Sequence, residues 1–284
     1  MNLKKGGFTL IELLVVISII ALLLAIMMPA LGMVKERARR VTCGSNLKQV
    51  GISMLTYATD NNNKVPPSWM EENWRGTAGY AGWAAYFACH INPNATSDQD
   101  KIIGDPYNMT WLITTDYLKD PKVFYCPSAR TVSKTYSYEP YIGRLSWPFV
   151  KNPPGNSNSA AVRVSYSYIP QVRAREVIQC GSSNRDVKVH MVGYKVSNMT
   201  SSTSLAADLI DTQNTVMHRA GVNKPAGINV LHGDGHVVFS NDKEAINADD
   251  FWGDSQDRPN LPNQNGYNLR ALLGLFKGTA QILD

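Results

Sequence analysis

The chain has 284 residues, 18% of which are charged, and a formal net charge of +5. Two of the positive charges, Lys4 and Lys5, lie at the N-terminus, and the basic residues form no tract with interleaved aromatic side chains. Composition therefore gives no support for binding of nucleic acid. The four cysteines contain no C-x-x-C pair, which excludes zinc-ribbon and thioredoxin-type motifs of that spacing. The length suffices for one large domain with its own core.

An apolar run over residues 8–31 follows the basic residues and a glycine pair, Gly6 and Gly7. At ~1.5 Å per residue the run is long enough to cross a bilayer core of about 30 Å. One carboxylate, Glu12, interrupts the run, and an ionisable residue within a membrane segment is a candidate functional residue. A secretory signal carries its small-residue cleavage site after the apolar run, whereas here the glycines precede it. Cleavage after Gly7 would therefore leave the apolar helix on the mature protein.

The string Gly7-Phe8-Thr9-Leu10-Ile11-Glu12 resembles the N-terminus of the type IV pilin and type II secretion pseudopilin superfamily. The resemblance implies that a prepilin peptidase/methyltransferase cuts after Gly7 and methylates Phe8. It also implies that Glu12 pairs with the N-terminal amine of a neighbouring subunit during assembly. Pro29 matches the proline that many of these proteins carry, and it would either kink the helix or let it melt in a filament. A simple single-span anchor is the alternative.

The resemblance also implies a location. The protein would lie in the bacterial inner membrane as a single-pass protein with an exported C-terminal domain. It would then enter a periplasmic or cell-surface filament made of copies of itself or of related pilins. The basic residues between Lys35 and Arg40 would favour the opposite orientation by the positive-inside rule. We follow the resemblance, because the leader has to meet its peptidase at the cytoplasmic face.

A helical stripe continues beyond the apolar run. Apolar residues spaced by four and three, which is one face of an α-helix, are Cys43, Leu47, Val50, Met54 and Tyr57. The pattern predicts one helix over residues 8–60, ended by three asparagines and by a proline pair at 66–67. The predicted division is a leader at 1–7, a membrane and filament-core helix at 8–31, a continuing amphipathic helix at 32–60, and a globular β domain at 61–284.

Shorter elements are predicted in the globular part. A short helix is expected at 111–118, strands at 123–127, 162–169 and 204–208, and a helix at 269–276. The strongest hairpin signal joins residues 227–232 to residues 236–240 through the Asp234-Gly235 turn. The predicted fold class is α+β, a pilin-like lollipop with the long helix packed on an antiparallel sheet domain with loop insertions.

Scattered landmarks resemble a bacterial group of prepilin-type cleavage/methylation proteins. They are residues 43–49, which begin with Cys43, residues 124–127 around Cys126, and a C-terminal signature of His218, Asn229, Asp234, Gly235 and His236. Cys43 lies on the stripe facing the domain and Cys126 lies in a matched motif, so we expect a disulfide between them. Its loop of about 80 residues would contribute roughly 4 kcal/mol. Two buried free thiols are the alternative.

Metal and catalytic sites are less strongly indicated. Imidazole and carboxylate suit zinc, but strand alternation makes it difficult to place His218, His232, Asp234 and His236 around one ion. An ordinary turn with histidines bonded to backbone is the simpler interpretation. Some secretion pseudopilins hold calcium near their C-terminal loops, so the oxygen-ligand candidates for calcium are Asp208, Asp211 and Asp234. No other cofactor is expected.

The sequence contains no nucleophile elbow, zinc-protease, P-loop or dinucleotide motif. We therefore expect a structural subunit of a type IV pilus-like or type II secretion pseudopilus filament, and a membrane-anchored enzyme is a minor hypothesis. The alternative is a minor adhesive or glycan-binding subunit that uses the aromatic segment 69–87, where Trp74 and Trp83 stand out.

Overall fold

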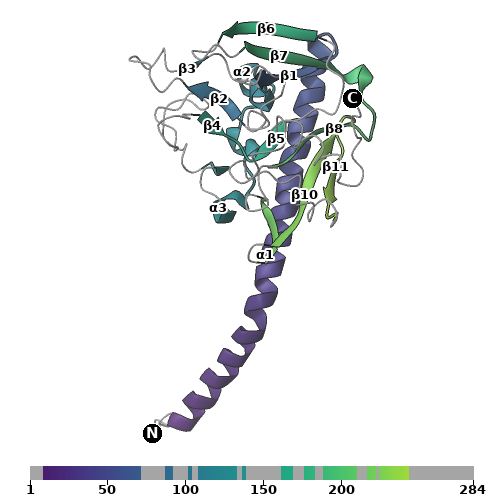
Figure 1. The fold of residues 1–284 in the computed structure, drawn as a ribbon. Coiled ribbons are helices and arrows are strands. Elements are labelled where there is room, and N and C mark those ends of the chain that lie inside the picture. The colour runs from purple at the N-terminus through teal and green to yellow at the C-terminus, as the bar shows by residue number, and fades with distance from the viewer. Residues whose placement is uncertain are drawn as a thin grey trace, which may run out of the picture. The chain divides into compact units, whose positions relative to one another are not determined.

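The computed structural model describes residues 9–71, 87–91, 102–103, 108–132, 136–138, 161–168, 176–182, 188–209, 216–221 and 224–242. The chain divides into two compact units, Met1–Ala38 and Arg39–Asp284. A long N-terminal helix is followed by antiparallel sheets, which confirms the predicted α+β, pilin-like arrangement (Figure 1).

Helix α1 runs without interruption over Leu10–Asp60 and includes Pro29. Its residues up to Val34 are largely apolar, and their large side chains are exposed on every face of the helix. An 18-residue window of this helix has a mean hydropathy of 3.0, and none of that window is buried. By length and composition the helix can cross a membrane. Apolar surface of this extent requires lipid or other protein around it.

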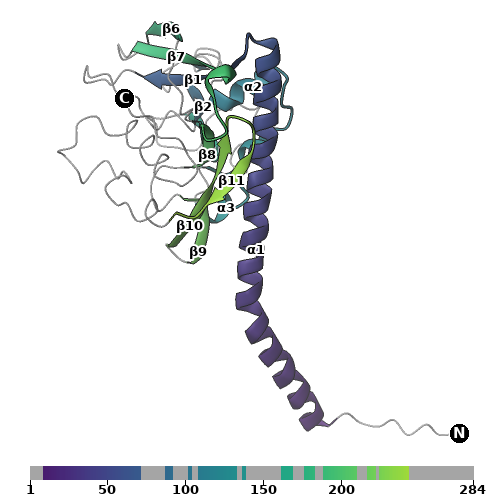
Figure 2. The same ribbon diagram turned by 90° about the vertical axis from the view of Figure 1, so that its right-hand side faces the viewer.

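The second part of α1, residues 39–60, has a buried face. The predicted stripe is confirmed, because Cys43, Leu47, Val50 and Met54 are fully buried and Tyr57 is 8% exposed. Gly51 lies on the same face, where a Cβ atom would come within 2.6 Å of Leu231 Cδ1. This close approach lets strand β10 (Lys224–His232) lie along the helix, as Figures 1 and 2 both show.

The end of α1 follows from the asparagines after it. Asn62 and Asn63 have positive φ angles of 53° and 61°, a conformation that asparagine tolerates better than most residues. The Asn63 N–H donates to Ala58 O at 2.9 Å, and Asn61 Nδ2 donates to Tyr57 O at 2.8 Å, so the last carbonyls of the helix are satisfied. Strand β1 (Lys64–Glu71) begins immediately afterwards.

The strands form three antiparallel sheets with the orders β1-β7-β6, β3-β2-β4 and β11-β10-β8-β5, and β9 pairs with β10. The remaining strands are β2 (Phe87–Ile91), β3 (Ile102–Ile103), β4 (Ala161–Arg163), β5 (Tyr166–Tyr168), β6 (Glu176–Ser182), β7 (Lys188–Lys195), β8 (Ser204–Asp208), β9 (His218–Gly221) and β11 (Val237–Ser240). Short helical segments are η2 (Asn108–Thr110), α2 (Trp111–Thr114), η3 (Pro121–Phe124), α3 (Ala129–Val132) and η6 (Val196–Asn198).

The β10–β11 hairpin and strand β8 confirm the corresponding predictions. Residues Ile228 to Leu231 pair with Ser240 to Val237, and β10 pairs on its other edge with β8. This sheet, with β5 beyond β8, contributes Tyr166, Leu205 and Leu231 to a core that it shares with the buried face of α1.

Three local predictions were wrong. Residues 123–127 do not form a strand, because Asp120 accepts a hydrogen bond from the Lys122 N–H (2.9 Å) and Pro121 begins the 3₁₀ turn η3. The predicted helix at 111–118 ends earlier, at Thr114. The predicted strand at 162–169 is two strands, β4 and β5, which belong to different sheets.

Ser165 explains the division between β4 and β5. Its N–H donates to Phe124 O (3.0 Å), its carbonyl accepts from the Leu209 N–H (2.9 Å), and its hydroxyl donates to Tyr136 O. The backbone of Ser165 is therefore bonded to two other segments, which ends the first strand before the second begins.

Candidate functional site

Thr9 and Glu12 form a closed hydrogen-bonded unit at the start of α1. Glu12 Oε2 accepts from both the Thr9 N–H and the Thr9 hydroxyl, each at 2.8 Å, and the Glu12 N–H donates to Thr9 Oγ1 at 3.3 Å. A threonine followed three residues later by a glutamate is the capping-box pattern, which satisfies backbone donors that have no partner within the helix. Gly7 and Phe8 lie outside the described residues.

A second candidate site is a buried group of four chemically active side chains in the globular unit. Cys43 comes from α1, Cys126 from the turn between η3 and α3, Asp208 from the end of β8 and His218 from the start of β9. One ligand atom from each residue lies within 4.8 Å of the other three. Cys126 is 2% exposed and the other three side chains are fully buried. We call these four residues the Cys–Asp–His cluster.

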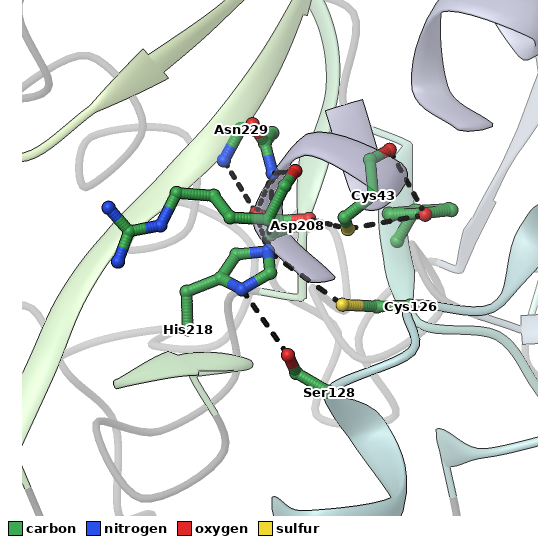
Figure 3. Close-up of polar contacts among 8 residues, drawn as sticks. Cys43, Cys126, Ser128, Asp208, His218 and Asn229 are labelled. Atoms are coloured by element: carbon green, nitrogen blue, oxygen red, sulfur yellow. Dashed lines mark hydrogen bonds and ion pairs between the residues drawn. The ribbon is translucent and has the colours of Figure 1, made fainter. Parts of the chain in front are cut away.

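Hydrogen bonds connect the members of the Cys–Asp–His cluster (Figure 3). The Cys43 thiol donates to Asp208 Oδ1 at 2.9 Å. His218 Nε2 lies 3.3 Å from Asp208 Oδ2 and 3.8 Å from Cys126 Sγ. Each of the four residues therefore contacts at least one other member directly.

Two further residues, Asn229 and Ser128, contact members of the Cys–Asp–His cluster. Asn229 donates its backbone N–H to Asp208 Oδ2 at 2.5 Å and its side-chain amide to the same oxygen at 3.0 Å. Ser128 Oγ lies 3.5 Å from His218 Nδ1 (Figure 3). The Asp208 carboxylate and the His218 ring are thus oriented by groups on β10 and at the start of α3.

The two thiols of the cluster differ in acidity. Burial raises the pKa of Cys43 well above its usual value, and its hydrogen bond to Cys126 and the nearby Asp208 charge raise it further. Burial also opposes ionisation of Cys126, but its interactions with Cys43 and His218 more than offset this effect and lower the pKa of Cys126 to about 7. Cys126 is therefore the thiol that ionises first.

The β10–β11 turn holds the other part of the predicted C-terminal signature. Asp234 Oδ1 accepts from the His236 N–H at 3.0 Å and contacts the His236 ring at 2.5 Å. Gly235 has a φ of +82°, and its carbonyl accepts from Lys48 Nζ at 2.7 Å. Asn229 and His218 thus serve the buried cluster, whereas Asp234, Gly235 and His236 build a turn that is bonded to α1.

Comparison with known families gives two matches. Residues 2–28 match the prokaryotic N-terminal methylation motif, and residues 33–172 match a family described as a protein of unknown function (DUF1559). The chain therefore carries a prepilin-type methylation motif, and its arrangement of a long helix followed by antiparallel sheets is pilin-like. No curated protein and no solved structure matches the chain. The DUF1559 match includes Cys43 and Cys126 but ends before the C-terminal signature, so the resemblance of that signature stays a prediction.

The expected disulfide between Cys43 and Cys126 is absent from the structure, in which both residues are free thiols. Their positions follow the prediction, since both are buried in the same cluster. The Cys43 sulfur is directed instead at Asp208 Oδ1 and lies 3.3 Å from the Tyr166 hydroxyl. The second alternative from the sequence, two buried free thiols, describes the structure.

The calcium candidates do not come together as a group within the described residues. Asp208 lies in the Cys–Asp–His cluster, Asp234 lies in the β10–β11 turn, and Asp211 is outside the described residues. Calcium prefers oxygen ligands, whereas the neighbours of Asp208 are two thiols and an imidazole. Trp74 and Trp83 of the aromatic segment also lie outside the described residues, as does the helix predicted at 269–276.

All four residues of the Cys–Asp–His cluster are candidates from the sequence, but in different roles. The sequence predicts a disulfide between Cys43 and Cys126, places His218 in the C-terminal signature, and makes Asp208 a calcium candidate. No local sequence pattern links these four residues. They come together only because α1 packs against the segments that carry residues 126, 208 and 218.

His232, at the end of β10, is expected to make stability depend on pH. Its side chain is 2% exposed and stacks on His236 with ring centroids 4.3 Å apart. Burial, and then the nearby His236 charge, lower the pKa of His232 below its ordinary value of about 6.5. Below pH ~6.5 the unfolded chain therefore binds a proton that the folded chain resists, and stability falls as the pH is lowered through that window.

The measurement is the melting temperature of the protein in detergent at pH 7.5, 6.5 and 5.5. His232→Phe, which places an apolar ring at the same position, should reduce the loss between pH 7.5 and 5.5. Asp234 does not affect this comparison. The hydrogen bond from the His236 N–H lowers the pKa of Asp234, so the stability that its carboxylate contributes is lost only at more acidic pH. Equal losses in the two proteins would contradict the assignment.

Proposed function

We propose that the protein is a structural subunit of a type IV pilus-like or type II secretion pseudopilus filament. A prepilin peptidase/methyltransferase would remove residues 1–7 and methylate Phe8, and the mature chain would assemble through α1. The role is structural rather than enzymatic, with the globular unit exported from the inner membrane. The proposed partners are the peptidase and copies of this chain or related pilins.

One observation carries this proposal. The apolar side chains of α1 between Leu10 and Val34 are exposed all around the helix, in a chain that carries the prepilin-type methylation motif. A helix of this kind is stable in lipid, and it is equally suited to a bundle of identical helices after extraction from lipid. The single carboxylate of that stretch, Glu12, lies at the end where the processed N-terminus would be.

The first test is the mass of the mature N-terminus. The full-length protein would be expressed in bacterial membranes with and without a prepilin peptidase/methyltransferase, and the N-terminal peptide analysed by mass spectrometry. With the enzyme, the peptide is expected to begin at Phe8 and to carry one methyl group on its amine. A chain that still begins at Met1, beside a reference prepilin that the same cells process fully, would refute the proposal.

The second test concerns assembly. Filaments sheared from cells that hold the complete assembly machinery would be imaged with antibody against the globular unit. Label along filaments, or in short periplasmic assemblies, is the expected result and distinguishes a pilus from a pseudopilus. Fully processed protein that stays dispersed in the membrane would support a single-span anchor instead.

A further inference from the structure

We propose that the Cys–Asp–His cluster is a structural zinc site in which Cys43, Cys126, Asp208 and His218 are the four ligands. The proposal concerns the globular unit and does not depend on filament assembly. Thiolate, imidazole and carboxylate are the three ligand types that proteins use for Zn²⁺, and four protein ligands make a closed structural site rather than a catalytic one.

The distances between donor atoms suit a tetrahedral ion. With ordinary zinc–ligand bond lengths, a tetrahedron has edges of ~3.5 Å between sulfur and nitrogen, ~3.3 Å between nitrogen and oxygen, and ~3.5 Å between sulfur and oxygen. The observed separations are 3.8 Å for Cys126 Sγ to His218 Nε2, 3.3 Å for His218 Nε2 to Asp208 Oδ2, and 2.9 Å for Cys43 Sγ to Asp208 Oδ1. Two of these contacts involve different oxygens of Asp208, of which a four-coordinate ion takes one. One ligand atom from each of the four residues lies within 4.8 Å of the other three, so shifts of up to about 1 Å would complete the shell.

The surroundings of the ligands also fit a metal site. His218 presents Nε2 to the cluster while its Nδ1 lies 3.5 Å from Ser128 Oγ, as expected when the second nitrogen of a metal-bound histidine is hydrogen-bonded. Asn229 donates to Asp208 Oδ2 from both its backbone and its side chain, and these donors stabilise the negative charge of a site with two thiolates and one carboxylate. All four ligands are buried, so water does not compete for the ion.

A zinc ion here would join four segments that are distant in the sequence. It would link α1 to β8, to β9 and to the turn before α3. Because such a site forms only in the folded chain, the binding of the ion stabilises the fold. The expected consequence is that a chelator lowers the melting temperature and that added Zn²⁺ restores it, whereas added Ca²⁺ does not.

The experiment uses the full-length protein, purified in detergent with reductant and a tag that contains no histidine. Elemental analysis after dialysis should give about one zinc per chain. Replacement of zinc by Co²⁺ should produce thiolate-to-cobalt charge transfer and the visible bands of tetrahedral cobalt, which Zn²⁺ abolishes and Ca²⁺ leaves unchanged. Cys126→Ser should weaken zinc binding by at least about tenfold. Cys180→Ser, which makes the same substitution at a position of β6 in another sheet, is the matched control and should bind as the parent does.

Three results would overturn the proposal. They are a disulfide between Cys43 and Cys126 in the freshly purified protein, unchanged zinc binding in Cys126→Ser, and the absence of thiolate-to-cobalt charge transfer in the unaltered protein. The cobalt spectrum needs no substitution, so it decides the question even if Cys126→Ser does not fold.

Discussion

Cells that express Glu12→Ala are expected to contain the protein in the membrane but to form no filaments. The substitution removes the single carboxylate from the exposed apolar stretch of α1, so insertion into lipid becomes easier rather than harder. The resemblance to pilins implies that this carboxylate pairs with the Phe8 amine of a neighbouring subunit. Without that pair, apolar packing alone does not specify the stagger between neighbouring helices.

The structure gives Glu12 a second role that has to be separated from the first. Its carboxylate accepts the Thr9 N–H and hydroxyl, so Glu12→Ala removes this half of the capping box together with the charge. Glu12→Gln keeps an acceptor for the Thr9 N–H but removes the charge, whereas Thr9→Val removes the hydroxyl and keeps the carboxylate. If pairing between subunits governs assembly, Glu12→Gln should fail like Glu12→Ala, and Thr9→Val should form filaments.

The measurement is the amount of protein in the sheared filament fraction relative to the amount in the membrane fraction, for all three variants. A normal filament yield from Glu12→Gln would rule out the charge pair. It would assign the function of Glu12 to the helix cap.

Gly227→Ala is expected to destabilise the globular unit by about 3–5 kcal/mol, from backbone strain and overpacking together. Gly227 has a φ of +145°, which residues with a side chain rarely adopt. A Cβ atom there would lie 2.2 Å from Ser240 O and 2.8 Å from Phe239 Cζ. Ser240 O is backbone, so no rotation of a side chain can remove this collision.

The location of Gly227 explains why the space is so restricted. Gly227 pairs with His218 of β9, and the next residue, Ile228, pairs with Ser240 of β11. Strand β10 therefore changes partner at this residue. A displacement here would also move His218 and Asn229. Gly227→Ala should therefore disturb the contacts that these two residues make with Asp208.

Thermal unfolding of the full-length protein in detergent, followed by circular dichroism, measures this effect. For a unit of this size, 3–5 kcal/mol corresponds to a fall of roughly 6–20 °C in melting temperature. Gly32→Ala is the control, because a Cβ atom at Gly32 meets nothing within 4 Å. If Gly227→Ala and Gly32→Ala had the same melting temperature, the backbone of β10 would have to adjust without cost, and the prediction would be wrong.

The sequence alone was sufficient for the features that depend on local pattern. The length and composition of the apolar run, the position of Glu12, the helical stripe from Cys43 to Tyr57 and the Asp-Gly hairpin are local properties, and periodicity or turn chemistry encodes each of them. The prepilin-type motif is a short contiguous string, so it too could be found without a structure.

Only the tertiary structure decided how the distant landmarks combine. Residues 121–124 form a 3₁₀ turn rather than a strand because Asp120 caps it, and residues 162–169 divide because Ser165 is bonded to Phe124, Leu209 and Tyr136. The Cys–Asp–His cluster has no contiguous signature, since its members lie at residues 43, 126, 208 and 218 and meet only in the folded chain. Side-chain spacing along a chain determines which face a residue occupies, but the packing of one element against another determines which residues share a site.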